Sequence, residues 1–152
     1  MAEHPTVRRF RERLTELGLD VDVQELAAST RTAGDAAAAV GVEVGQIVKS
    51  LVFVGDDGPV LCLCAGDRRV DTTKLGSNVR QANGDEVREA TGFAIGGVPP
   101  VGHGRPVRTV VDSSLRRFPT VWCAAGTPNA VFSVSTEALI AAIPDAVVQD
   151  VA

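Results

Sequence analysis

The stretch QIVKSLVFVGDDGPVLCLCA, residues 46–65, decides the fold that we expect. Residues 47–54 and 59–65 are two apolar runs joined by the turn GDDG, which is typical of a β-hairpin. Both alternating faces of the first run are apolar except at Lys49 and Ser50, as expected for a strand that is covered on two sides. The hairpin is therefore predicted to lie in the interior of the protein.

Lys49 is unusual in this strand, because alternation places it on one face with Ile47, Leu51 and Phe53. Burying an unpaired ammonium costs on the order of several kcal/mol, so its head group needs a partner. The pattern leaves three alternatives open. The side chain reaches water at the rim of the sheet, it pairs with an internal carboxylate such as Asp112, or it binds an anionic ligand.

Helices are predicted on both sides of the hairpin. Residues 5–17 carry apolar side chains at spacings of three and four, which indicates an amphipathic helix. Thr32 is a suitable N-cap for a short alanine-rich helix that ends near Val40, before Gly41. The polar segment 71–92 predicts two short helices, with Asn83 as a cap and Gly92 as a stop.

The second half of the chain is dominated by apolar runs. Strands are predicted at RTVVD (108–112), TVWCAA (120–125) and AVFSV (130–134), followed by a helix that begins at Ser135 or Thr136 and ends at Pro144. This order lacks the regular alternation of a doubly wound sheet. We expect an α+β fold in which residues 1–152 form a single domain, with a mixed, mainly antiparallel sheet flanked by short helices.

Composition excludes several classes of function. The 152 residues are 45% apolar and 22% charged, as in globular proteins, and no run approaches the roughly 20 apolar residues of a membrane helix. The charged N-terminus lacks the apolar core of a signal peptide, so we expect a cytoplasmic protein without a membrane partner. A net charge of −4 argues against a large, sequence-independent nucleic-acid surface, so no DNA partner is expected, but it leaves room for a local phosphate contact. The arginines of residues 5–17 form either an RNA contact or a solvated helix face.

Metal, cofactor and nucleophile chemistry have no supporting motif. Cys62, Cys64 and Cys123 lie in apolar segments and are expected to be buried free thiols, and His4 and His103 are isolated. Neither a dinucleotide fingerprint, nor a P-loop, nor a G-x-S-x-G motif occurs, so no cofactor and no metal are expected. If the protein is an enzyme, its chemistry depends on positioning and a water molecule.

Two segments rich in small residues are candidates for the walls of a site. The loop IGGVPPVGHG, residues 95–104, has glycines that allow a backbone to approach a ligand, and its two prolines stiffen that approach. The segment CAAGTPNAVF, residues 123–132, follows a predicted strand and forms either a second wall or a plain turn.

These residues also carry a family resemblance, which covers about residues 25–143. In order and spacing, four segments resemble the YbaK/ProX family of aminoacyl-tRNA deacylases, which also occurs as the editing insertion of bacterial prolyl-tRNA synthetases. They are TRTAGDAAAAVGVEVGQIVKSLVFV, CAGDRRVDTTKL, ATGFAIGGVPPVGHGRPVRTVVDSSL and VWCAAGTPNAVFSVSTEAL. The lysine within VKSL and the GGVPPVG loop are the most specific parts.

The resemblance implies roles for individual residues. The lysine at position 49 is expected to hold a phosphate of the terminal tRNA nucleotide, and Gly96 is expected beside the scissile ester, so Lys49, Gly96 and Gly97 form the predicted catalytic set. The predicted substrate-binding residues are Ser50, Pro100, Gly102, Asp112, Ala124, Ala125, Gly126 and Asn129. The implied partners are the 3′ end of an aminoacyl-tRNA and an aminoacyl-tRNA synthetase.

The function expected on this basis is trans-editing, the hydrolysis of the ester of a tRNA, of tRNA(Pro) type, charged with a wrong small amino acid. Cysteine-specific members carry an aspartate and a tyrosine where this chain has Val131 and Val23, which favours another small amino acid. Two alternatives remain: a non-catalytic module that binds a tRNA end or a nucleotide beside a synthetase, and a hydrolase of another small ester or amide.

Overall fold

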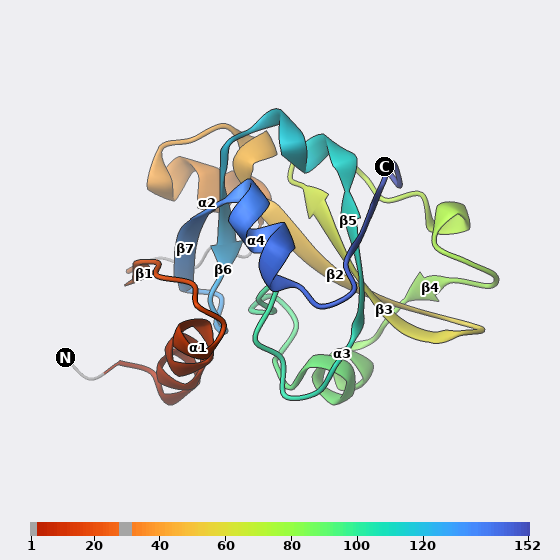
Figure 1. Cartoon of the computed structure of the whole chain (residues 1–152), viewed down its shortest axis with the longest axis horizontal. Helices are drawn as coiled ribbons and strands as arrows, with labels where there is room; N and C mark the ends of the chain where they lie inside the picture. The colour runs from red at the N-terminus through yellow and green to blue at the C-terminus, as the bar shows by residue number, and fades with distance from the viewer. Residues whose placement is uncertain (1–2, 28–31) are drawn as a thin grey trace.

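The computed structural model of the chain describes residues 3–27 and 32–152, and within them the strands form two sheets (Figure 1). The helices are α1 (Pro5–Glu16), α2 (Ala33–Val40), α3 (Gly84–Thr91) and α4 (Thr136–Ala142), with 3-10 turns η1 (Val44–Gln46), η2 (Thr72–Lys74) and η3 (Ser113–Arg117). The strands are β1 (Val23–Glu25), β2 (Val48–Gly55), β3 (Gly58–Ala65), β4 (Arg80–Gln81), β5 (Arg108–Asp112), β6 (Thr120–Ala124), β7 (Ala130–Ser135) and β8 (Val147–Gln149).

The hairpin of β2 and β3 forms the centre of the larger sheet, whose strand order is β4-β2-β3-β5-β8. β5 runs parallel to β3, and β8 runs parallel to β5, whereas the other pairs of this sheet are antiparallel. The smaller sheet has the order β1-β7-β6 and is antiparallel throughout. A single parallel bridge between Ile47 and Trp122 links the start of β2 to β6.

The main hydrophobic core fills the space between the two sheets. It joins one face of β2 and β3 to β6, β7, α4 and α1, and the rings of Phe10 and Phe132 meet there at 5.5 Å between their centroids. A smaller cluster, which includes Phe53, Cys62 and Val110, covers the other face of the larger sheet. Strand β2 is therefore apolar on both sides because both sides are covered, as its sequence pattern predicts.

The α+β fold class is confirmed, and several helix limits follow from the predicted caps. The Thr32 side chain accepts a hydrogen bond from the Asp35 N–H at the start of α2, and Gly41 ends that helix in a left-handed conformation. Asn83 and Glu86 cap each other's backbone at the start of α3, and Gly92 ends it. Side-chain capping therefore fixes helices that are too short to be stable alone.

Other features differ from the sequence prediction. The first of the two helices expected in residues 71–92 is only the three-residue turn η2, and β4 lies between it and α3. Strands β1 and β8 have three residues each and were not predicted. The strands divide between two sheets.

Among the described residues, no helix is long and apolar enough to cross a membrane.

Asp112 anchors the C-terminal segment against the larger sheet. Its side chain is 1% exposed; Oδ1 accepts the Val151 N–H at 2.8 Å, and Oδ2 accepts the N–H and the hydroxyl of Ser114. Both oxygens of Asp112 are therefore engaged in holding the chain after β5 and after β8, and Val151 is fully buried as a result.

We predict that Asp112→Ala lowers the free energy of unfolding by about 2 to 4 kcal/mol, because it leaves buried N–H groups without acceptors. Denaturant unfolding followed by circular dichroism measures this loss. Asp57→Ala, in the exposed turn between β2 and β3, is the matched control and should change stability by less than about 0.5 kcal/mol. Equal stability of the two variants would contradict the anchoring role of Asp112.

Candidate active site

The candidate site begins with an unpaired edge of β2. On one side, β2 pairs with β3 along its whole length. On the other side, β4 meets β2 only at Phe53 and Val54, and the Ala82 N–H donates to the Val52 carbonyl at 3.0 Å. Among the described strands, none is therefore paired with residues 48–51 on that side, and these residues line a cavity.

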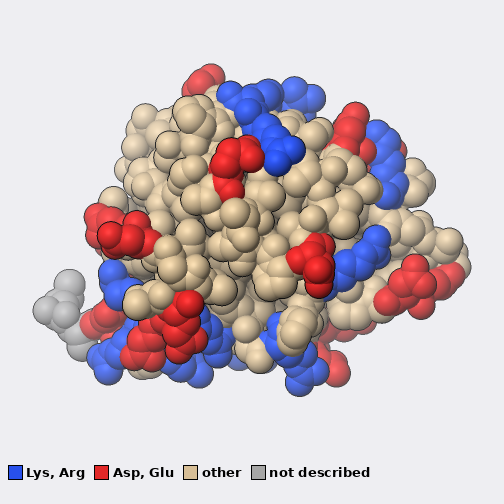
Figure 2. Space-filling view, in the orientation of Figure 1, with Lys and Arg blue, Asp and Glu red and all other residues tan. Residues whose placement is uncertain are grey.

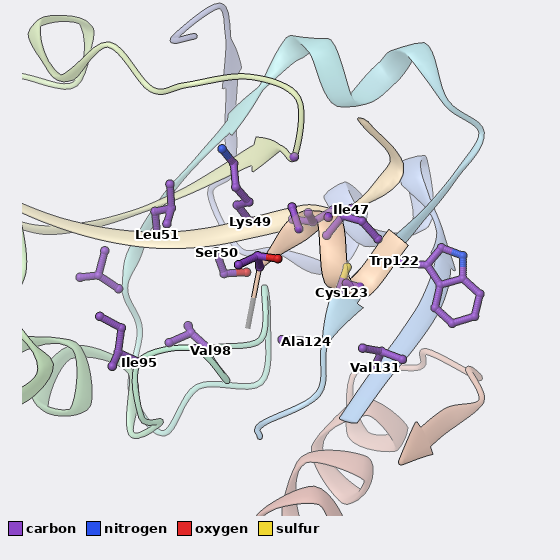
Figure 3. Close-up of a pocket in the computed structure, with 18 of the residues that line it drawn as sticks. Ile47, Lys49, Ser50, Leu51, Ile95, Val98, Trp122, Cys123, Ala124 and Val131 are labelled. Atoms are coloured by element: carbon purple, nitrogen blue, oxygen red, sulfur yellow. The ribbon is translucent and has the colours of Figure 1, made fainter. Parts of the chain in front are cut away.

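This cavity has a volume of about 550 Å³ (Figure 3). Its walls come from α2, the start of β2, the turn after β3, the segment from β4 to α3, the loop after α3, β6 and β7. The lining is mostly apolar, and Figure 3 shows Ile95 and Val98 on one side of the cavity with Ala124 and Val131 on the other. A concave, largely apolar pocket with few polar groups is typical of small-ligand sites.

Lys49 is one of these polar groups, and it points to the opposite side of β2 from Ser50 (Figure 3). Its Nζ donates a hydrogen bond to the Arg68 carbonyl oxygen in the turn after β3. Lys49 is half-buried, so its ammonium is held at the border of the cavity and not deep in the core. Because Asp112 uses both of its oxygens elsewhere, a main-chain carbonyl takes the place of the carboxylate considered from the sequence.

Ser50 lies on the face of β2 that is directed toward the main core, and it lines the cavity. Its hydroxyl oxygen is buried, yet it makes no hydrogen bond to any described residue. Such a group is destabilising unless a ligand or a water molecule satisfies it. Ser50 is therefore a candidate contact for a polar atom of a bound substrate.

The glycine loop forms the wall that carries Ile95 and Gly96. Gly96 is exposed, lines the cavity and has a φ of 89°, which favours glycine. The Gly97 N–H donates to the Ala94 carbonyl at 3.0 Å, whereas the Gly96 N–H has no acceptor among the described residues. Gly96 thus offers a free donor at the cavity, and Gly97 uses its donor to hold the turn.

Gly97 also joins the two predicted walls. A Cβ atom at Gly97 would lie 2.8 Å from the carbonyl oxygen of Gly126 and from the Cα of Thr127. Only glycine permits this approach without a shift of backbone. The segments 95–104 and 123–132, which the sequence presents as separate small-residue stretches, are therefore packed directly against each other.

The structure brings some of the predicted site residues to the cavity and places others behind it. Lys49, Ser50, Gly96 and Ala124 line it. The residues that do not line it are Gly97, Pro100, Gly102, Asp112, Ala125, Gly126 and Asn129. Three of the latter have other contacts: Gly102 accepts a hydrogen bond from Arg13 at 2.6 Å, the Asn129 carbonyl accepts the Leu26 N–H at 2.7 Å, and Asp112 anchors Val151.

The cavity also contains residues that the sequence reasoning did not select. Gln81, Val87 and Trp122 line it, as does the first turn of α2 with Thr32. Trp122 is the only tryptophan of the chain, and that was the available signal. Gln81 and Val87 had no comparable signal, because their place depends on how β4 and α3 meet β2.

The charge of the described cavity lining comes from one residue. Among the described lining residues, Lys49 is the charged one, and the lining includes no carboxylate and no imidazole. Cys123 lines the cavity as well, but burial raises the pKa of its thiol, so it is protonated at neutral pH. The arrangement can hold an anion at one end and polarise a carbonyl with the Gly96 N–H, while water is the available nucleophile.

Comparisons with known proteins show similarity in both sequence and fold. The family model described as the aminoacyl-tRNA editing domain matches residues 27–142. A crystal structure of a protein provisionally described as a trans-editing enzyme for prolyl tRNA synthetase is 50% identical, with a TM-score of 0.91, and the match covers 99% of this chain and 98% of that one.

Two further proteins are similar to this chain in sequence. YwhH of Bacillus subtilis, an uncharacterized protein, is 34% identical over 139 residues, which are 88% of each chain. The proline–tRNA ligase of Lactobacillus gasseri is 39% identical over 80 residues, which are 49% of this chain but only 14% of the ligase. The shared part is therefore a small portion of that ligase.

His103 is a buried histidine that is hydrogen-bonded to the backbone of the glycine loop. Its Nε2 donates to the Pro99 carbonyl at 2.8 Å, and its ring meets the edge of Phe93. Burial lowers the pKa of His103 below its usual value of 6.5, with the nearby Arg13 charge acting in the same direction. The neutral imidazole is thus the form that the folded protein favours.

We expect the stability contributed by neutral His103 to be present above pH 6.5 and lost as the pH falls through its lowered folded-state pKa. Between pH 8 and pH 5, wild type should therefore lose more free energy of unfolding than His103→Gln, which keeps an amide donor for Pro99. Urea unfolding of both proteins at several pH values measures the difference. Parallel pH dependence of the two proteins would rule out this role for His103.

Proposed function

The chain belongs to the aminoacyl-tRNA editing domain family, and from this we propose that it is a trans-editing deacylase that hydrolyses the ester of a mischarged tRNA. The observation that carries the proposal is the cavity itself, which has a held ammonium at one border and a free backbone donor on its glycine wall. We further propose a tRNA(Pro)-type substrate charged with a small amino acid, association with a prolyl-tRNA synthetase, and action in the cytoplasm, where aminoacyl-tRNA is made.

The proposed reaction assigns one role to each polar group. Lys49 binds the phosphate of the terminal nucleotide and so places the ester against the glycine loop. A water oxygen bonds to the ester carbonyl carbon, and the Gly96 N–H stabilises the charge that develops on the carbonyl oxygen. The bond to the ribose oxygen then breaks, that oxygen takes a proton, and the free amino acid and uncharged tRNA leave. Lys49 transfers no proton in this scheme.

The cavity supports a preference for small side chains. Beside Ala124, the wall is formed by Val98, Cys123 and Val131, so apolar groups surround the space next to Gly96. An apolar pocket discriminates only weakly against a smaller side chain, which is why editing uses a second site to remove what the first one admits. Ser50 adds a single polar contact, which we assign to the amino acid or to the ribose of the substrate.

The absence of a carboxylate and an imidazole from the described lining favours one alternative function. A site without a general base is also what a non-catalytic module would have, one that binds the end of a tRNA. A stable analogue in which an amide replaces the ester separates the two functions. Binding of this analogue without hydrolysis of any mischarged tRNA would support the binding module.

We predict that Lys49→Ala reduces kcat/KM for the best mischarged tRNA about 10- to 100-fold, because a charge-assisted contact to phosphate is worth about 1.5 to 3 kcal/mol. Deacylation of a panel of tRNAs charged with alanine, serine, cysteine and proline measures it. Lys74→Ala is the matched control, since Lys74 is the other lysine of the chain and lies outside the cavity lining. No activity on any substrate, or equal effects of the two variants, would refute the proposal.

Ser50→Ala should separate stability from activity. Removing a buried hydroxyl that has no partner in the described structure is expected to leave the free energy of unfolding unchanged or to raise it by up to about 1 kcal/mol. Deacylation by the same variant should fall about 5- to 10-fold through loss of one substrate contact. Ser133→Ala, on β7 and outside the cavity lining, is the control for both measurements. A large loss of stability in Ser50→Ala would show that the hydroxyl has a structural role instead.

A further inference from the structure

The turn that follows β3 carries two arginines beside Lys49. It is the main-chain carbonyl of Arg68 that accepts the Lys49 ammonium, and Gly66 of the same turn lines the cavity. The turn is packed closely, because a Cβ atom at Gly66 would lie 2.4 Å from the Val44 carbonyl oxygen and 2.8 Å from the Ala33 Cβ. Arg68 and Arg69 therefore follow, by two and three residues, a closely packed glycine that lines the cavity.

The charges of this turn are unequally satisfied. Asp67 is bound by Arg117 through two contacts of 2.7 and 3.0 Å, and this pairing lowers the pKa of Asp67. Arg68 lies 3.9 Å from the same carboxylate with its side chain 48% exposed, so its guanidinium has only a weak partner. Arg69 is exposed and forms no ion pair with a described residue.

This local excess of positive charge stands out in a chain whose net charge is −4. On the visible face of the molecule, acidic and basic side chains mostly alternate, and a group of basic side chains lies above η3, the element that carries Arg117 (Figure 2). Arg117 in turn connects η3 to the Arg68 turn through Asp67. Lys49, Arg68 and Arg117 are thus linked through the contacts of one turn.

We propose that Arg68 and Arg69 bind the phosphodiester groups of the single-stranded RNA that precedes the esterified nucleotide. This inference rests on the proposed function, in which Lys49 holds the phosphate of the terminal nucleotide. The next phosphates of the same strand lead away from the cavity, and guanidinium groups suit them because their forked donors match phosphate oxygens. The turn thereby extends recognition from one nucleotide to the strand before it.

The substitution Arg68→Ala with Arg69→Ala tests the proposal cleanly, because the carbonyl that holds Lys49 belongs to the main chain and remains. The probes are the trinucleotide CCA with a 5′-phosphate, which carries the additional phosphates, and adenosine 5′-monophosphate, which lacks them. Calorimetric titration over a range of salt concentrations gives the affinity of each probe. The control is the double variant Arg8→Ala with Arg9→Ala, which removes two adjacent exposed arginines from α1.

The Arg68 and Arg69 variant should bind the trinucleotide about 10-fold more weakly and bind the mononucleotide as wild type does. Its slope of log affinity against log salt should fall by about 1.4, which is roughly 0.7 for each lost phosphate contact with a single strand. The Arg8 and Arg9 control should match wild type for both probes. In Figure 1, α1 lies low on the left of the view, apart from the end of β3 in its upper part, where the Arg68 turn begins.

Three outcomes would overturn the inference: unchanged trinucleotide affinity, an equal loss for the mononucleotide, or a larger loss in the Arg8 and Arg9 control. The second outcome would mean that the arginines act on the terminal nucleotide and not on the strand before it, and the third would place the RNA on α1. These binding measurements do not require turnover. Arginine-dependent binding in a protein that hydrolyses no mischarged tRNA would therefore sustain this inference while the proposed deacylation failed.

Discussion

The unequal pairing of β2 is the constraint on which the rest of the structure depends. A strand in the interior of a sheet normally satisfies its backbone on both sides, yet β4 reaches only the last part of β2. The first half of the strand is left with one free edge in a region where apolar residues crowd both faces. Among the described residues, the smaller sheet is bridged to this edge at Ile47 and Trp122, and the cavity lies beside the rest of the edge.

The glycine contacts convert this gap into a site with two defined walls. Gly97 against Gly126 fixes the distance between the loop after α3 and the loop between β6 and β7. Helix α1 packs against both loops. Phe10 and Arg13 lie next to Gly102, and Thr6 lies next to Gly126. Gly102 and Gly126 are therefore important for the site without lining it, since they hold the backbone that presents Gly96 to a substrate.

Much of the fold could be predicted from the sequence because its signals are local. Capping residues at Thr32 and Asn83, terminal glycines and the alternation in residues 47–54 each act within one element. Strands β1, β4 and β8 could not be found in this way, because two or three residues with polar members carry no periodicity. Their existence is decided by partners far along the chain.

The same limit applies to the site. That Lys49 needs a partner followed from its strand, but the partner is the Arg68 carbonyl, which carries no sequence signal. Asp112 was considered as a partner of Lys49 and, from the resemblance, as a substrate contact, and its carboxylate holds Val151, which lies 39 residues further on. That the Ser50 hydroxyl has no hydrogen-bond partner among the described residues depends on all the surrounding elements at once, and the resemblance to a family could name the position but not that property.

The burial of the three thiols affects how readily they react with oxidants. Cys62, Cys64 and Cys123 are all buried, and burial is the main reason that their pKa values are raised, to about 12 for Cys62. Oxidants such as peroxide attack the thiolate form of an accessible cysteine, and these side chains are buried and protonated. The cysteine in the cavity wall is therefore in the form that reacts slowly with peroxide.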